Sequence, residues 1–114
     1  PTQQTSGGVR ERSRVREPRK YKVIIHNDDF TTMEFVVKVL TSVFFKTEEE
    51  ATAMMLKVHN EGQAVVGAYC YDLAASRVRS AVAMARRQGF PLRFSINRNR
   101  MEMERQIKMS ESLQ

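Results

Sequence analysis

The stretch YKVIIHNDDFTTMEFVVKVL, residues 21–40, decides how the chain folds, because it joins an apolar strand to a helix across a short polar turn. Tyr21, Val23 and Ile25 alternate with the residues between them, which is the period of a half-buried β-strand. This alternation predicts a strand over residues 21–26. The letters NDDF then turn the chain. Two adjacent carboxylates in that turn repel each other, and chain folding alone does not require them there.

Two helix starts follow the turn, and each carries the same signature. Thr31 with Glu34, and Thr47 with Glu50, have the spacing of a capping box, in which each side chain bonds the backbone N–H of the other residue. They predict two consecutive helices, one over MEFVVKVLTSVF and one over EEATAMMLKVHNEG. Gly62 is a natural left-handed stop for the second helix.

The second half of the chain adds two strands and one helix. QAVVGAYCY, residues 63–71, is predicted to be a strand, and Asp72 is predicted to cap a helix over LAASRVRSAVAMARRQ. Gly89 ends that helix, and PLRFSIN, residues 91–97, forms the last strand. The order β-α-α-β-α-β predicts an α+β domain, with a three-stranded antiparallel sheet and three helices on one face.

Charge and composition divide the chain into three parts. The net charge is +6, but residues 1–20 hold six basic and two acidic residues, whereas residues 21–97 hold nine basic and eight acidic ones. The sequence therefore predicts a disordered N-terminal extension over residues 1–19 that has too few apolar side chains to pack. A folded core over residues 20–97 and a C-terminal tail over residues 98–114 complete the expected organisation.

The bulk composition favours a single cytoplasmic domain. The apolar fraction of 41% is enough for a modest core, and no apolar run approaches the length of a membrane span. No segment has the pattern of a secretory signal. The single cysteine, Cys70, cannot form an internal disulfide, which makes a reducing cytosol the default expectation.

The residues that carry chemistry do not favour an enzyme or a metal protein. Cys70 with His26 or His59 would give a nucleophile and a base, but Cys70 falls in an apolar segment where a free cysteine is usually an inert packing residue. His26, Asp28 and His59 together would offer three ligands to zinc or non-haem iron. Their spacing is not diagnostic, so neither catalysis nor a metal or other cofactor is expected.

Two other interpretations of the polar turn stay open at this point. In the simpler one, Asn27 and Asp28 bond their own backbone and shape a turn, while Asp29 adds a negative charge near a helix N-terminus. In the other, Asn27, Asp28 and His59 offer three acceptors to an ammonium group, which needs several partners before it can leave water.

Apolar residues flank the three acceptors. Met33 and Val36 are three residues apart on the first predicted helix, and Met55 and Val58 are three apart on the second, so each pair shares a helix face. Polar acceptors beside a methionine-rich pocket are suited to an amine that carries a large apolar group. The second interpretation therefore predicts a ligand of that kind.

Two segments, YKVIIHNDDFTTMEFVVKVL and ATAMMLKVHNEGQAVVGAY, closely resemble ClpS, the bacterial adaptor family of the N-degron pathway. The resemblance runs over residues 20–97. It implies a domain that binds proteins whose first residue is Leu, Phe, Tyr or Trp. The domain would hand these proteins to the ClpA unfoldase, which feeds the ClpP protease.

The resemblance also implies roles for individual residues in peptide binding. Asn27, Asp28 and His59 would contact the free α-amino group, and Thr31 would help to position the first residues of the peptide. Met33 would gate the pocket against β-branched side chains. The implied lining of the pocket consists of apolar residues from four predicted elements: Ile25, Met33, Val36, Met55, Val58 and Leu92.

The same resemblance implies a surface for the unfoldase. Asp72 and Arg77 would fall on the surface that contacts the N-domain of ClpA, and residues 1–19 would be the segment that the unfoldase engages during delivery. The alternative function is a small basic nucleic-acid-binding module, since the third predicted helix carries several arginines: Arg77, Arg79, Arg86 and Arg87. The predicted strands lack an aromatic pair spaced to stack bases, so no nucleic-acid partner is expected. No membrane partner is expected either.

Overall fold

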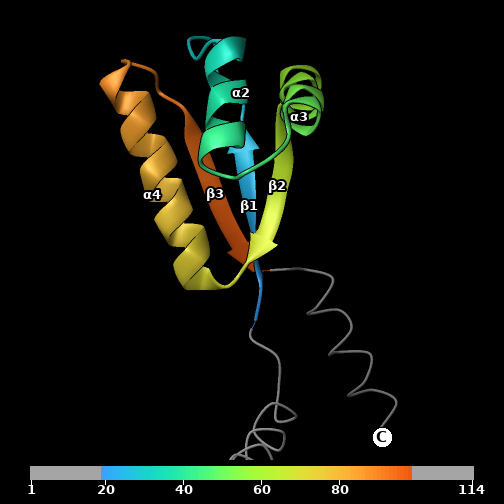
Figure 1. The fold of residues 1–114 in the computed structure, drawn as a ribbon, viewed down its shortest axis with the longest axis vertical. Helices are drawn as coiled ribbons and strands as arrows, with labels where there is room; N and C mark the ends of the chain where they lie inside the picture. Colours follow the sequence, from blue (N-terminus) through green and yellow to red (C-terminus); the bar gives the residue numbers. More distant parts are fainter. Residues whose placement is uncertain (1–18, 99–114) are drawn as a thin grey trace, which may run out of the picture.

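A computed structural model of the chain describes residues 19–98 and confirms the predicted order of elements (Figure 1). The elements along the chain are β1 (Tyr21–His26), α2 (Met33–Ser42), α3 (Glu48–Glu61), β2 (Gln63–Tyr69), α4 (Tyr71–Arg87) and β3 (Arg93–Arg98). The extension predicted over residues 1–19 and the tail predicted over residues 98–114 lie outside the described residues, apart from Arg19 and Arg98. Arg98 belongs to β3.

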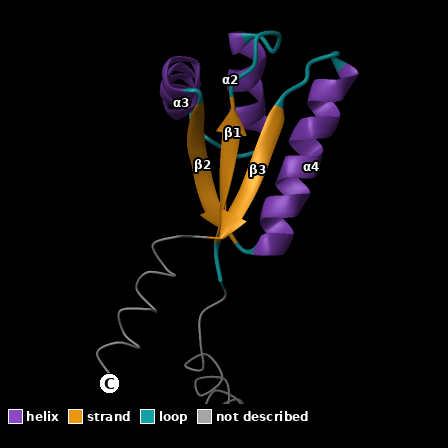
Figure 2. Cartoon of the chain, turned by 180° about the vertical axis from the view of Figure 1, so that it is seen from behind, coloured by secondary structure: helices purple, strands orange, loops and turns teal. Residues whose placement is uncertain are grey.

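The three strands form one antiparallel sheet in the order β2-β1-β3, so the first strand of the chain is the central one. His26 pairs with Gln63 of β2 and with Arg93 of β3, which brings the end of β1 beside the starts of both other strands. The helices of the described chain lie on one face of this sheet (Figure 2). The predicted fold class, α+β with helices on one face, is therefore confirmed.

The core lies between the sheet and the helices. Val23 and Ile25 of the central strand are fully buried, as their alternation predicts. The buried residues of α4 are all alanines, which allow that helix to approach the sheet closely. The remaining members of the cluster come from the other elements and from the loops next to them: Phe35, Val36, Val39, Leu40, Phe44, Ala51, Val58, Ala64, Val66 and Leu92.

The predicted capping boxes have different outcomes. The Thr47 box is confirmed: its hydroxyl accepts from the N–H of Glu50 at 3.1 Å, and the Glu50 carboxylate accepts from the N–H of Thr47 at 2.9 Å. The box predicted at Thr31 is wrong. The cap of α2 is Thr32, whose hydroxyl accepts from the N–H of Phe35 at 3.2 Å. Thr31 instead donates its hydroxyl to a carboxylate in the preceding turn.

The predicted start of the third helix is also wrong. Cys70 is the N-cap of α4 and Asp72 lies within its first turn, where a negative charge favours the helix dipole. The strand before it ends at Tyr69, so Cys70 lies outside the sheet and is exposed. It is therefore not the buried packing residue that the sequence suggested. Among residues 19–98, no helix has both the length and the apolar character that a membrane span needs.

Candidate functional site

The loop after β1 is organised around the carboxylate of Asp28. One oxygen, Oδ1, accepts from the backbone N–H of Phe30 at 2.8 Å and of Thr31 at 2.7 Å, while Oδ2 accepts from the hydroxyl of Thr31 at 2.7 Å. A carboxylate has about four acceptor sites. These three bonds fix the carboxylate in one orientation and leave room for about one more donor on Oδ2. The simpler interpretation of Asp28 as a turn-forming residue is thus confirmed, and it is compatible with binding a ligand.

Asp28 is held in its charged form. Partial burial alone would raise the pKa of its carboxyl group, but the hydrogen bonds from Thr31 and Phe30 and the positive charge of Arg86 outweigh that effect and lower the pKa. The group is therefore ionised at neutral pH. A fixed negative charge with a free acceptor position is the feature that an ammonium ion requires from its partner.

Asn27 connects this loop to the end of α3. Its backbone N–H donates to the carbonyl oxygen of Gly62 at 2.9 Å, and the N–H of Gly62 donates to the carbonyl of Val58 at 2.8 Å. His59 lies in that same last turn of α3. The two bonds therefore bring the helix turn that carries His59 next to Asn27 and Asp28. The side chains of Asn27 and His59 are exposed, so they are accessible to a ligand from solvent.

Gly62 is essential to this connection because its backbone is left-handed, with φ at 92°. Gly62→Ala should destabilise the domain by about 1–2 kcal/mol, the usual cost of placing a Cβ in that conformation. Space is not the cause, since a Cβ at Gly62 meets no described atom within 4 Å. Gly89→Ala is the matched control, with φ at 79° and the same free space.

Denaturant titrations should show a similar loss of stability for both glycine variants. Hydrogen exchange should separate them, because only Gly62→Ala should speed exchange of the Asn27 amide, which bonds to the Gly62 carbonyl. Equal protection of that amide in both variants would show that the bond does not depend on the left-handed cap.

The predicted pocket residues lie in two layers. Ile25, Val36, Val58 and Leu92 are each at most 7% exposed and belong to one buried cluster, and Met55 is partly buried against it. Met33, in contrast, is 44% exposed on the first turn of α2. The structure therefore places four of these residues in the core, Met55 partly buried against the core, and Met33 at the surface.

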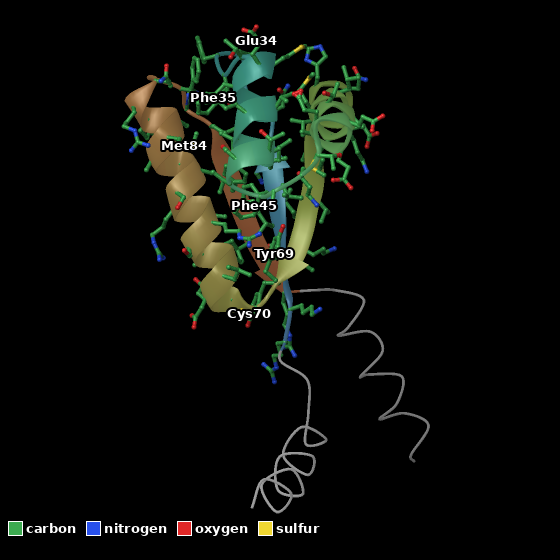
Figure 3. The ribbon with its side chains drawn as sticks, in the orientation of Figure 1. Glu34, Phe35, Phe45, Tyr69, Cys70 and Met84 are labelled. Atoms are coloured by element: carbon green, nitrogen blue, oxygen red, sulfur yellow. The ribbon has the colours of Figure 1, made fainter. Side chains whose placement is uncertain are left out.

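Helix geometry indicates the side of α2 to which Met33 belongs. Phe35 points from α2 toward α4 (Figure 3), with its ring centroid 5.1 Å from that of Phe90. Met33 is two residues earlier, about 200° around the helix, and therefore lies on the side away from α4. That side faces α3, which carries Met55 and His59.

The residues implied for the unfoldase lie elsewhere. Asp72 and Arg77 belong to the first half of α4, which begins next to Cys70, at the opposite end of the domain from Glu34 (Figure 3). The guanidinium carbon of Arg77 lies 4.9 Å from the ring centroid of Phe45 and 5.2 Å from that of Tyr69. These contacts fix Arg77 by cation–π attraction.

Two of the helical arginines that suggested nucleic-acid binding are used within the domain. Arg77 stacks on Phe45 and Tyr69, and Arg86 donates from Nη1 to the carbonyl oxygens of Phe90 at 2.7 Å and Leu92 at 3.1 Å. Both guanidinium groups are therefore held by contacts within the domain.

The groupings considered for catalysis and metal binding are not assembled. The side chain of His26 bonds Ser95 at 2.6 Å, and burial together with the charge of Arg93 lowers the pKa of His26. β1 ends at His26, so Asp28 does not share a strand face with it. Cys70 follows the other end of the paired strands, far from either histidine. Within residues 19–98, no three His, Cys, Asp or Glu side chains are grouped to hold a metal.

The structure also shows two features that the sequence analysis missed. An open cavity of about 440 Å³ lies between α3 and β2, lined by Lys57, Glu61, Gly62, Gln63, Ala64 and Val65. It includes none of the predicted pocket residues. Phe30, in the loop itself, is 73% exposed. An apolar residue in a turn sequence carries no signal of its exposure, so the exposure of Phe30 was not open to prediction.

Comparison with known proteins decides the family. The family model described as ATP-dependent Clp protease adaptor protein ClpS matches residues 16–95. The chain belongs to the ClpS family. It is accordingly an adaptor of the Clp protease and not a catalyst, as the sequence resemblance implied.

Individual ClpS proteins show how far the similarity extends. ClpS of Nitratidesulfovibrio vulgaris strain DP4 is 53% identical over 81 residues, which cover 71% of this chain and 78% of that relative. ClpS of Syntrophus aciditrophicus is 48% identical over 84 residues, covering 74% and 78%. Among solved structures, Agrobacterium tumefaciens ClpS2 bound to L-phenylalaninamide matches with a TM-score of 0.70 and 36% identity. That match covers 73% of this chain and all of the ClpS2 chain.

Proposed function

We propose that this ClpS chain binds proteins that carry an N-terminal Leu, Phe, Tyr or Trp and delivers them to the ClpA unfoldase for degradation by ClpP. The observation that carries the proposal is the oriented, ionised carboxylate of Asp28, fixed beside the last turn of α3. The ligand in the ClpS2 structure, L-phenylalaninamide, joins a free amine to a phenylalanine side chain and supports the same chemistry here.

The places of these residues in the fold support the roles proposed for them. Asp28 supplies the negative charge for the α-ammonium group, and the exposed Asn27 and His59 supply two further acceptors. Thr31 acts through Asp28, because its N–H and hydroxyl hold the carboxylate in place. The first side chain of the peptide enters between Met33 and Met55 and rests on the buried cluster.

Magnitudes explain why both parts of the ligand are needed. Burying a Leu or Phe side chain contributes about 1.5–3 kcal/mol. Each charge-assisted hydrogen bond to the ammonium adds about 1.5–3 kcal/mol. Association costs about 4–15 kcal/mol, so neither part binds usefully alone. An internal leucine lacks the amine, and an N-terminal serine lacks the apolar group.

Fluorescence anisotropy with labelled peptides that differ only in the first residue tests the proposal. Peptides beginning with Leu, Phe, Tyr or Trp should bind with a micromolar Kd or better, which is a binding free energy of about −8 kcal/mol. Peptides beginning with Ser or Gly should not bind at this strength. Equal affinity across the series would exclude this binding specificity.

Met33 is proposed to set the limit on side-chain shape. Met33→Ala should widen the pocket entrance and admit N-terminal Ile or Val, improving their binding about tenfold, because the branch at Cβ no longer meets the methionine. The same anisotropy assay measures the ratio of Phe to Ile affinities. Since Met33 is 44% exposed, the variant should keep its fold. An unchanged Phe-to-Ile ratio would remove Met33 from this role.

Delivery uses the other end of the domain in this proposal. Asp72 and Arg77 lie on the first half of α4, away from the loop that holds Asp28. A ClpA N-domain bound there would leave the peptide site open, so substrate and unfoldase are bound at the same time. Residues 1–19 are proposed as the segment that the unfoldase engages.

A further inference from the structure

Phe30 is exposed to an extent that the fold does not explain. Its side chain is 73% exposed, slightly more than Phe45 at 71% and well above Met33 at 44%. A large aromatic group is normally placed where it removes apolar surface from water. Phe30 instead lies in the loop between β1 and α2, two residues beyond Asp28.

The backbone that carries Phe30 is fixed. The N–H of Phe30 donates to Oδ1 of Asp28 at 2.8 Å, and Thr31, the next residue, bonds the same carboxylate twice. Thr32 then caps α2. The side chain of Phe30 therefore leaves a rigid turn at a defined point. A rigidly mounted apolar group costs little conformational entropy when it contacts a ligand.

The position of this group relative to the proposed amine site suggests what it contacts. The nitrogen of Phe30 lies 2.8 Å from the carboxylate that is proposed to bind the α-ammonium group. In a bound peptide the second Cα lies about 3.8 Å from the first. Successive side chains of an extended peptide point in opposite directions. When the first side chain enters the pocket, the second stays at the rim of the loop, within reach of an aromatic ring.

We infer that Phe30 is a specificity-determining residue for the second position of the bound peptide, where it favours aromatic and large aliphatic side chains. This inference rests on the proposed function, because it takes Asp28 as the partner of the peptide amine. Aromatic and apolar contacts of this kind, made at a partly exposed rim, change affinity by about twofold to tenfold. The preference is therefore smaller than that for the first residue.

The test compares peptides that share an N-terminal Phe and differ only in the second residue, which is Phe, Leu, Ala or Ser. Competition anisotropy with the full chain should give about twofold to tenfold tighter binding for Phe or Leu than for Ser at that position. In Phe30→Ala this ratio should fall to about one, and in Phe30→Tyr it should be retained, because the aromatic ring remains.

Phe45→Ala is the matched control. Phe45 is the same residue type with nearly the same exposure, but it follows α2 and lies against Arg77, at the other end of that helix. It should leave the second-position ratio unchanged. Thermal denaturation of each variant checks that the fold is retained.

The outcomes separate this inference from the proposed function. If Phe30→Ala keeps the same second-position ratio as the original chain, Phe30 has no role in specificity and the inference is overturned. If the original chain shows no preference at the second position, the inference also fails, although the proposed function stands. Failure of the proposed function itself would appear as binding that does not depend on the first residue or on a free amine.

Discussion

Acetylating the amino terminus of a Phe-starting peptide is expected to weaken its binding to this chain by at least about 100-fold. The acetyl group removes the positive charge and leaves a single N–H where an ammonium has three donors. Asp28 then loses its counter-charge, and the acceptors of Asn27 and His59 lose their donors. Two charge-assisted bonds lost at about 1.5–3 kcal/mol each account for the size of the effect.

The measurement is competition anisotropy with free and acetylated peptides of one sequence. A peptide with N-terminal Ser, free and acetylated, is the control, since it lacks the apolar side chain and should bind weakly in both forms. Comparable binding of the free and acetylated Phe peptides would show that the site recognises the side chain alone.

Replacing Asp28 with asparagine is expected to weaken binding of a Phe-starting peptide by about 10- to 150-fold, the value of one charge-assisted hydrogen bond. The substitution separates the two roles of this residue. The amide oxygen of asparagine can still accept from the N–H groups of Phe30 and Thr31, so the turn should remain. The negative charge that the ammonium needs is removed.

Asp29→Asn is the matched control, because it removes the same charge from the adjacent, exposed residue. It should change affinity less than about threefold, since an exposed charge in water contributes little. Thermal denaturation should show both variants folded. If Asp28→Asn binds as tightly as the original chain, Asp28 only shapes the turn and the proposed amine contact is wrong.

The sequence predicted the parts of the fold that depend on local pattern. Alternation in YKVIIH defined the central strand, and Gly62 ended α3 in the left-handed conformation that its position implied. The Thr47 box formed as the spacing of Thr47 and Glu50 implied. In each case the deciding interaction lies within a few residues along the chain.

The failed prediction at Thr31 involves a choice between competing local partners. Thr31 had the correct spacing for a capping box with Glu34, but Asp28, three residues earlier, takes both its hydroxyl and its N–H, so the cap moves to Thr32. Sequence spacing alone cannot rank two partners that are equally close along the chain. At the start of α4, the expected cap Asp72 lies within the first turn, and the residue at the N-cap position, Cys70, makes no side-chain cap hydrogen bond.

The candidate site was predictable in its residue types but not in its layers. Nothing in the sequence shows that Val36, Val58 and Leu92 are buried while Met33 reaches the surface, because burial depends on how the helices cross the sheet. The bond between Asn27 and Gly62, which joins the two halves of the site, is likewise a product of tertiary structure.

An NMR titration of isotope-labelled protein with L-phenylalaninamide tests most directly whether this loop and the end of α3 bind a free amine joined to an apolar side chain. The largest backbone shifts are expected on residues 27–33 and 55–62, and N-acetyl-L-phenylalaninamide at the same concentration should leave the signals of these residues unshifted. Shifts confined to Gln63–Val65, or equal shifts with the acetylated compound, would contradict this expectation.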